Sequence, residues 1–126
     1  MKIATLSAAL TLAATAALAD DPDYFTSAQG LSMERDDRGV LIVTINDGNG
    51  GPITFTAQDH TEFTHTVYEI AQDLDNSVVI LTGAEDYMAQ IDFQSFGNVG
   101  DPDVWSQVHD EGVQILENIA NIRVPM

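Results

Sequence analysis

His60 is the residue whose type and position best suit acid–base chemistry. It stands three residues before Phe63 and seven before Val67, so a helix through this segment places its imidazole on the apolar face. It also falls in the first helical turn, where the positive end of the helix dipole disfavours a charged imidazole. A neutral, inward-facing histidine can act as a general acid or base. The same pattern is typical of a histidine packed in a core without function, and the spacing leaves both interpretations open.

The other patterns that carry chemistry are incomplete in this sequence. No histidine pair has a zinc-ligand spacing such as HExxH, and no serine stands in GxSxG. The stretch NDGNGG at 46–51 lacks the lysine of a P-loop, so we interpret it as a loop. The acidic clusters, Asp110 and Glu111 among them, lack the spacing of a calcium loop, and we expect them on solvated faces. The sequence therefore predicts no metal site.

The elements that must position His60 begin with a hairpin and a capped helix. Residues 31–35 alternate apolar and polar side chains, DDRG at 36–39 is typical of a turn, and residues 40–45 are a β-branched run. Thr56 then predicts a helix start, with Asp59 three residues on as a variant of the capping box. The expected apolar stripe of this helix is Phe63, Val67, Ile70, Ala71 and Leu74.

The second half of the sequence continues the alternation of strand and helix. Residues 78–81 indicate a buried strand, and residues 90–96 carry no regular pattern. A second helix is expected from about Val104 to Asn121, and residues 124–126 resemble the start of another strand. This order predicts a single α/β domain. The expected apolar face of the second helix is Val104, Val108, Ile115, Leu116 and Ile119.

The amino terminus has the pattern of an export signal. Lys2 precedes an alanine-rich apolar run that ends in Ala17-Leu18-Ala19, a small-x-small cleavage pattern. We expect a signal peptide over residues 1–19, cleavage before Asp20 and a flexible leader over residues 20–30, the alternative being an uncleaved helix. The apolar run is too short to span a membrane. The protein is therefore expected in the periplasm or outside the cell, with no membrane attachment after cleavage.

The charge balance restricts the possible partners. Twenty acidic residues against four basic ones give a formal net charge of −16. Such a surface repels polyanions, which excludes nucleic-acid binding and disfavours the phosphates of coenzyme A. The sequence contains no cysteine, so neither disulfides nor thiol chemistry are possible.

Four segments carry a resemblance to a known family. VVILTG at 78–83, YMAQIDFQSF at 87–96, DPDVWSQVHDEGVQIL at 101–116 and IRVP at 122–125 resemble the 6-oxocamphor hydrolase branch of the crotonase (enoyl-CoA hydratase/isomerase) superfamily. The resemblance implies a crotonase-like ββα spiral fold, of which residues 31–126 would be the N-terminal part. It also implies retro-Claisen cleavage of a carbon–carbon bond in a small, apolar β-diketone that carries no coenzyme A.

The resemblance also assigns expected roles to individual residues. His60 falls at an active-site histidine, and the backbone N–H of Ile91 falls at the first oxyanion-hole position. Phe55 and Phe96 correspond to bulky residues that line the substrate pocket, and Asp92 matches a loop acid with a structural role. No metal or organic cofactor is implied. The complete protein would be a homotrimer or hexamer.

Two departures from the family pattern bear on the function. The hydratase pattern AGAD reads Ala89-Gln90-Ile91-Asp92 here, and no basic residue lies near it to bind coenzyme A phosphates, which favours the diketone hydrolases. The second oxyanion-hole element of the family would follow Met126, so we expect this chain alone to be inactive or nearly so. The alternatives are an acyl-CoA hydratase or isomerase, and a non-catalytic, truncated crotonase-like binding protein.

Overall fold

The computed structural model describes residues 21–126, apart from residues 85, 87 and 99. The expected export signal over residues 1–19 lies outside the described residues. Within the described part, neither long helix is apolar enough over a sufficient length to cross a bilayer.

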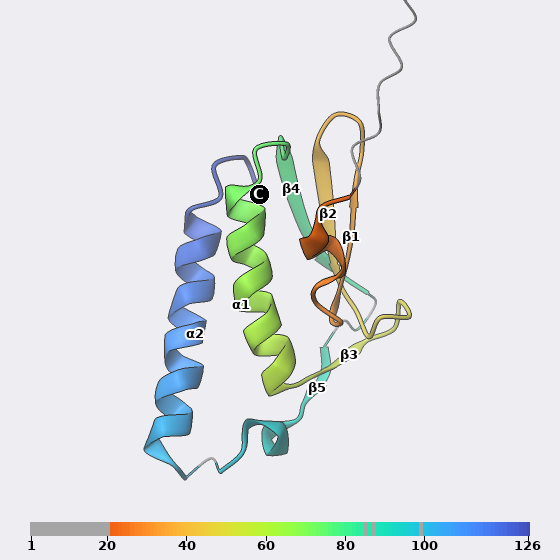
Figure 1. The fold of residues 1–126 in the computed structure, drawn as a ribbon. Helices are drawn as coiled ribbons and strands as arrows, with labels where there is room; N and C mark the ends of the chain where they lie inside the picture. Colours follow the sequence, from red (N-terminus) through yellow and green to blue (C-terminus); the bar gives the residue numbers. More distant parts are fainter. Residues whose placement is uncertain (1–20, 85, 87, 99) are drawn as a thin grey trace, which may run out of the picture.

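A three-stranded sheet forms one layer of the fold (Figure 1). Its strand order is β1-β2-β4, with β1 antiparallel to β2 and β2 parallel to β4. The expected hairpin between the first two strands is confirmed, and Gly39 in its turn has a φ of +78°, which favours glycine. The strand bounds are Leu31–Arg35 for β1, Val40–Ile45 for β2 and Val78–Gly83 for β4.

Two helices lie on one side of this sheet. Figure 1 shows α1 (Ala57–Gln72) between the sheet and α2 (Pro102–Ala120). The expected capping box is confirmed, because the Thr56 side chain accepts from the Asp59 N–H and the Asp59 side chain accepts from the Thr56 N–H. The second helix begins two residues earlier than expected, since a proline suits the first helical turn.

Two short strands at the start of α1 were not expected from the sequence. Strand β3 (Ile53–Phe55) pairs in parallel with β5 (Met88–Ile91), and the 3₁₀-helix η2 (Phe93–Phe96) follows directly. Residues 90–96, expected to be irregular, are therefore mostly regular structure. Strands of three and four residues are too short for the alternation of side chains to be recognised. Together these pieces form the surroundings of the α1 N-terminus (Figure 1).

The segment expected as a flexible leader contributes to the core. It contains the 3₁₀-helix η1 (Asp23–Thr26), whose Tyr24 and Phe25 side chains are buried. The structure thus differs from the expectation for residues 23–28, because two aromatic side chains remove more apolar surface from water than a polar leader would. The buried core cluster consists of Tyr24, Phe25, Ala28, Leu31, Leu41, Val43, Ile70 and Val79.

An ion pair ties β1 and η1 to the end of α1. Arg35 Nη1 lies 2.6 Å from Asp73 Oδ2, and each side chain is only 13% exposed. The Tyr24 hydroxyl donates to the same carboxylate oxygen at 2.8 Å, and the Asp75 N–H donates to Oδ1. Burial alone would raise the pKa of Asp73, but the hydrogen bonds from Asp75, Tyr24 and Arg35 outweigh it and lower that pKa below its usual value.

Two residues placed on the expected apolar stripes are exposed instead. Leu74 is 77% exposed because α1 ends at Gln72, two residues before it. Leu116 is 68% exposed because α2 packs on α1 through a narrower face that excludes it.

Candidate active site

The His60 imidazole is bound to a carboxylate of the neighbouring helix. His60 lies in the first turn of α1, and its Nδ1 atom is 2.8 Å from Oε2 of Glu111 on α2. The two side chains are only 14% and 18% exposed, respectively. The contact joins residues that stand far apart in the sequence and depends on how the two helices pack. Because the two side chains are partly buried, the hydrogen bond between them is stronger than the same pair would be on the surface.

Two further donors hold Glu111 in place. Thr61 Oγ1 donates to the Glu111 carboxylate at 3.1 Å, and Gln107 Nε2 donates to its Oε1 at 3.0 Å. Burial alone would raise the pKa of Glu111, but hydrogen bonds from Gln107, His60 and Thr61 outweigh it and lower that pKa. An ionised carboxylate can only accept, so His60 donates through Nδ1–H. In the neutral imidazole, Nε2 then carries the free lone pair.

Two aromatic rings contact the imidazole. The Phe55 ring centroid is 6.2 Å and the Phe96 ring centroid 6.1 Å from that of His60, both edge-on. Ser95 brings Phe96 there, because its Oγ accepts from the Ala57 N–H at the start of α1 at 2.9 Å. Three of the predicted site residues are therefore neighbours in the structure.

The orientation of the Ile91 amide follows from the pairing of β3 and β5. The Asp92 N–H donates to the Phe55 carbonyl at 2.9 Å. Successive amides of an extended strand point to opposite sides, so the Ile91 N–H points away from β3. The Ile91 side chain is 42% exposed. Asp92 itself caps η2 by accepting from the Gln94 N–H, in keeping with a structural role.

Two cavities are lined by residues that contact His60, one by Phe55 and the other by Phe96 and Glu111. The first, which we call the apolar cavity, has a volume of about 220 Å³. Its apolar walls come from Leu31, Ile45, Ile53, Phe55, Phe63 and Ile115. The second, the interhelical cavity, has a volume of about 200 Å³ and includes Glu111, Thr61 and Gln107 in its lining. His60 itself lines neither cavity, but each cavity includes residues that contact it.

Gly112 on α2 lies next to His60 Nε2. A Cβ atom at position 112 would lie 3.9 Å from Nε2, with no other heavy atom within 4 Å outside the local helix backbone. The arrangement suits a general base whose other nitrogen is held by a carboxylate.

Glu111 was missed at the sequence level and is the main correction to the predicted site. We expected it on a solvated face with Asp110, but its side chain is mostly buried against His60. Its spacing could have indicated the burial but not the partner, since Glu111 stands three residues after Val108 and four before Ile115, on the packed face of α2. Within the described residues, no group of three acidic or histidine side chains is arranged to hold a metal ion.

Comparisons with known proteins find relatives among solved structures. No protein-family model matches the chain, and neither does any curated protein. A β-diketone hydrolase from the cyanobacterium Anabaena, in a structure bound to (S)-3-oxocyclohexyl acetic acid, is 42% identical with a TM-score of 0.79. The match covers 85% of this chain and 43% of the hydrolase.

Two hydratase structures share the fold at lower identity. An enoyl-CoA hydratase from Mycobacterium smegmatis is 16% identical with a TM-score of 0.61, over 76% of this chain and 37% of its own. An enoyl-CoA hydratase/isomerase from Mycobacterium paratuberculosis is 19% identical with a TM-score of 0.62. That match covers 79% of this chain and 40% of the hydratase/isomerase. The chain thus spans about two fifths of the length of the structures it matches.

Proposed function

We propose that the whole protein is a carbon–carbon hydrolase of the crotonase superfamily. This chain belongs to that superfamily and carries part of its α/β fold. Its substrate would be a small, apolar β-diketone that carries no coenzyme A. The observation that carries this proposal is the 42% identity to a β-diketone hydrolase, against 16% and 19% to the two hydratases. The contact of His60 with Glu111 supports an acid–base role at the same position.

The proposed reaction assigns the proton transfers to His60. A water oxygen bonds to one carbonyl carbon of the diketone, and the proton it loses passes to Nε2. The bond from that carbon to the central carbon breaks, and its electron pair forms the enolate of the second carbonyl. The imidazolium returns the proton to the central carbon, so that one diketone and one water yield one keto acid. Glu111 stabilises the transient imidazolium through Nδ1–H.

The remaining predicted residues act on the rest of the substrate. In this proposal Phe55 and Phe96 contact the apolar ring, and their edge-on position against His60 supports that assignment. The Ile91 N–H donates to the oxygen on which negative charge develops, as the first donor of an oxyanion hole. Its orientation away from β3 leaves it available for such a contact.

A ring-opening assay tests this proposal. The protein expressed from its whole reading frame is incubated with 2,2-dimethylcyclohexane-1,3-dione. The central carbon of this β-diketone carries two methyl groups and no proton, so the compound cannot form the stable anion of a 1,3-diketone. Proton NMR should detect 6-methyl-5-oxoheptanoate in proportion to enzyme. Absence of that product, from this dione and from bicyclic diones of similar size, would remove the hydrolase assignment.

The acyl-CoA and non-catalytic alternatives give different results. Calorimetric titration with crotonyl-CoA should show no binding, because the net charge of −16 repels the coenzyme phosphates. Micromolar binding with hydration of crotonyl-CoA would establish a hydratase instead. Ring binding with neither reaction would establish a non-catalytic binding protein.

The proposal also includes the location of the protein and its oligomeric state. The signal-like pattern of residues 1–19 supports a periplasmic or secreted location, and fractionation of cells producing the tagged protein tests it. The complete protein is proposed to be a homotrimer or hexamer, which light scattering measures directly.

A further inference from the structure

We propose that the apolar cavity binds an uncharged carbocyclic ring and that two carboxylates in its wall discriminate against rings that carry a carboxylate. This inference concerns ligand selectivity, which neither the fold nor the proposed chemistry determines. It rests on the size of the cavity, on the chemistry of its lining and on the fixed positions of Asp59 and Glu62.

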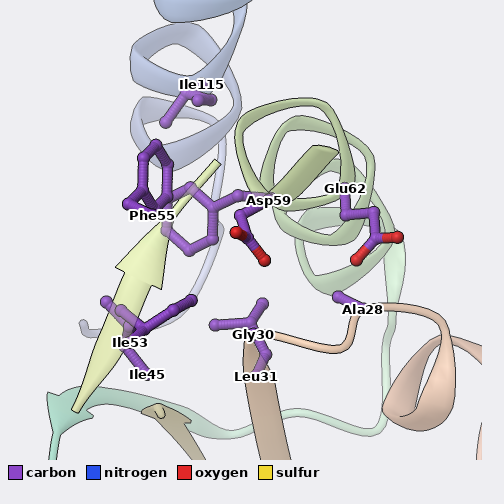
Figure 2. Close-up of a pocket in the computed structure, with 10 residues that line it drawn as sticks. Ala28, Gly30, Leu31, Ile45, Ile53, Phe55, Asp59, Glu62 and Ile115 are labelled. Atoms are coloured by element: carbon purple, nitrogen blue, oxygen red, sulfur yellow. The ribbon is translucent and has the colours of Figure 1, made fainter. Parts of the chain in front are cut away.

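The cavity has the size and lining for a single apolar ring. An apolar cavity of about 150 Å³ engineered in another protein binds benzene. The volume of about 220 Å³ here leaves space for a six-membered ring with a short substituent. Figure 2 shows Phe55, Ile53 and Ile115 on one side of the space, with Gly30 and Leu31 below it. The binding energy would come mainly from removing the ring from water.

The two carboxylates cannot easily turn away from this space. Asp59 Oδ2 accepts from the Thr56 N–H at 2.8 Å and from its hydroxyl at 2.6 Å. Glu62 Oε2 accepts from the Gln29 N–H at 2.9 Å, and its Oε1 accepts from Gln58 Nε2 at 2.6 Å. Figure 2 shows both carboxylates directed towards Gly30 and Ala28, on the side of the cavity opposite Ile53.

No cation compensates these two acids within the described part of the chain. Arg35 pairs with Asp73 and Arg38 with Asp36, and no ion pair of the described residues includes Asp59 or Glu62. The cavity lining contains no lysine or arginine. A second negative charge brought into the cavity would therefore meet uncompensated repulsion in a partly buried setting.

This selectivity has a consequence that rests on the proposed function. Hydrolysis turns an uncharged diketone into a keto acid, and that acid loses a proton at neutral pH. A cavity that accepts the neutral ring and repels the carboxylate would favour substrate over product. Product release would then be driven by the charge that the reaction itself creates.

Three matched ligands test the selectivity without any turnover. Cyclohexylmethanol, cyclohexanecarboxylate and cyclohexylmethylammonium share one ring and differ mainly in charge. Titrations of the 126-residue chain, followed by NMR of the Ile53 and Ile115 methyl groups, give the dissociation constants and the binding position. We expect the alcohol to bind about tenfold or more tightly than the carboxylate.

Two variants and one control assign the effect to the cavity. Glu62→Gln keeps an acceptor for the Gln29 N–H and should reduce the preference for alcohol over carboxylate at least threefold. Glu69→Gln removes the same charge from an exposed position on the same helix and should leave the preference unchanged. Gly30→Ala should weaken binding of the alcohol about tenfold, because its Cβ would lie 2.6 Å from Ile53 Cδ1.

Three results would overturn the inference: equal affinity for the alcohol and the carboxylate, no binding of the alcohol, or ligand-induced shifts confined to residues outside the cavity. Weaker binding of the ammonium ligand than of the carboxylate would also contradict it, since two uncompensated carboxylates must favour a cation over an anion. Selective binding of the alcohol without ring opening of any dione would sustain the cavity and refute only the hydrolase proposal.

Discussion

Removal of the Glu111 carboxylate should destabilise the fold through His60 and its neighbours. Glu111→Ala leaves donors on His60, Thr61 and Gln107 without their shared acceptor. Hydrogen bonds to a charged group contribute about 1.5–3 kcal/mol each when fully buried. The Glu111 side chain is 18% exposed and the freed donors can partly reach water, so the expected total loss is about 2 kcal/mol.

The assay is urea denaturation followed by circular dichroism. With an m value of about 1–3 kcal/mol/M for a small protein in urea, a loss of about 2 kcal/mol lowers the midpoint of unfolding by about 0.7–2 M. Glu117→Ala is the matched control, because Glu117 is exposed on the same helix and the change in helix propensity is the same. Glu111→Gln keeps one acceptor and should lose about half as much. Equal midpoints for the Glu111 and Glu117 variants would refute the reasoning.

Three other substitutions follow from single contacts. Asp73→Asn should cost about 2 kcal/mol by leaving the Arg35 guanidinium poorly paired. Because folding lowers the pKa of Asp73, its contribution is present at neutral pH and is lost as the pH falls through that lowered pKa. Urea melts of the two proteins should therefore converge only at a pH below the pKa of folded Asp73. Gly39→Ala should cost about 1–3 kcal/mol, since φ is +78° and the new Cβ would meet a backbone carbonyl oxygen at 2.5 Å; unchanged thermal stability would contradict this. Gly112→Ala should stabilise the protein by about 0.5–1 kcal/mol as a helix-interior change. Its Cβ would lie 3.9 Å from His60 Nε2 and should slow ring opening, and an unaltered rate would show that the reaction does not use the side of the imidazole that faces Gly112.

Local sequence signals were enough to predict the scaffold around His60. The β-branched run at 40–45 and the turn before it predicted the hairpin, and Thr56 with Asp59 predicted the start of α1. These features depend on residues within a few positions of one another. The proximity of Phe55, Phe96 and His60 came instead from the family resemblance, and the structure does place the three rings together.

Features that depend on distant packing were not predictable in the same way. Glu111 contacts His60 only because α1 and α2 pack side by side, and its spacing from Val108 indicates the packed face of α2 but not the partner that it meets there. Tyr24 and Phe25 stand in a polar stretch that indicates a leader, although both belong to the buried core cluster and contact Asp73 and Arg35, respectively. A single acid or aromatic residue in a polar stretch acquires its role from tertiary contacts.

The rate of dione ring opening by a His60→Gln variant tests the central claim most directly. Glutamine keeps a polar side chain of similar length but cannot exchange a proton, so kcat should fall about 10²–10⁴-fold. His65→Gln makes the same change at an exposed position of α1 and should retain the rate within about twofold. Equal rates for the two variants would show that the imidazole between Phe55 and Phe96 takes no part in the reaction.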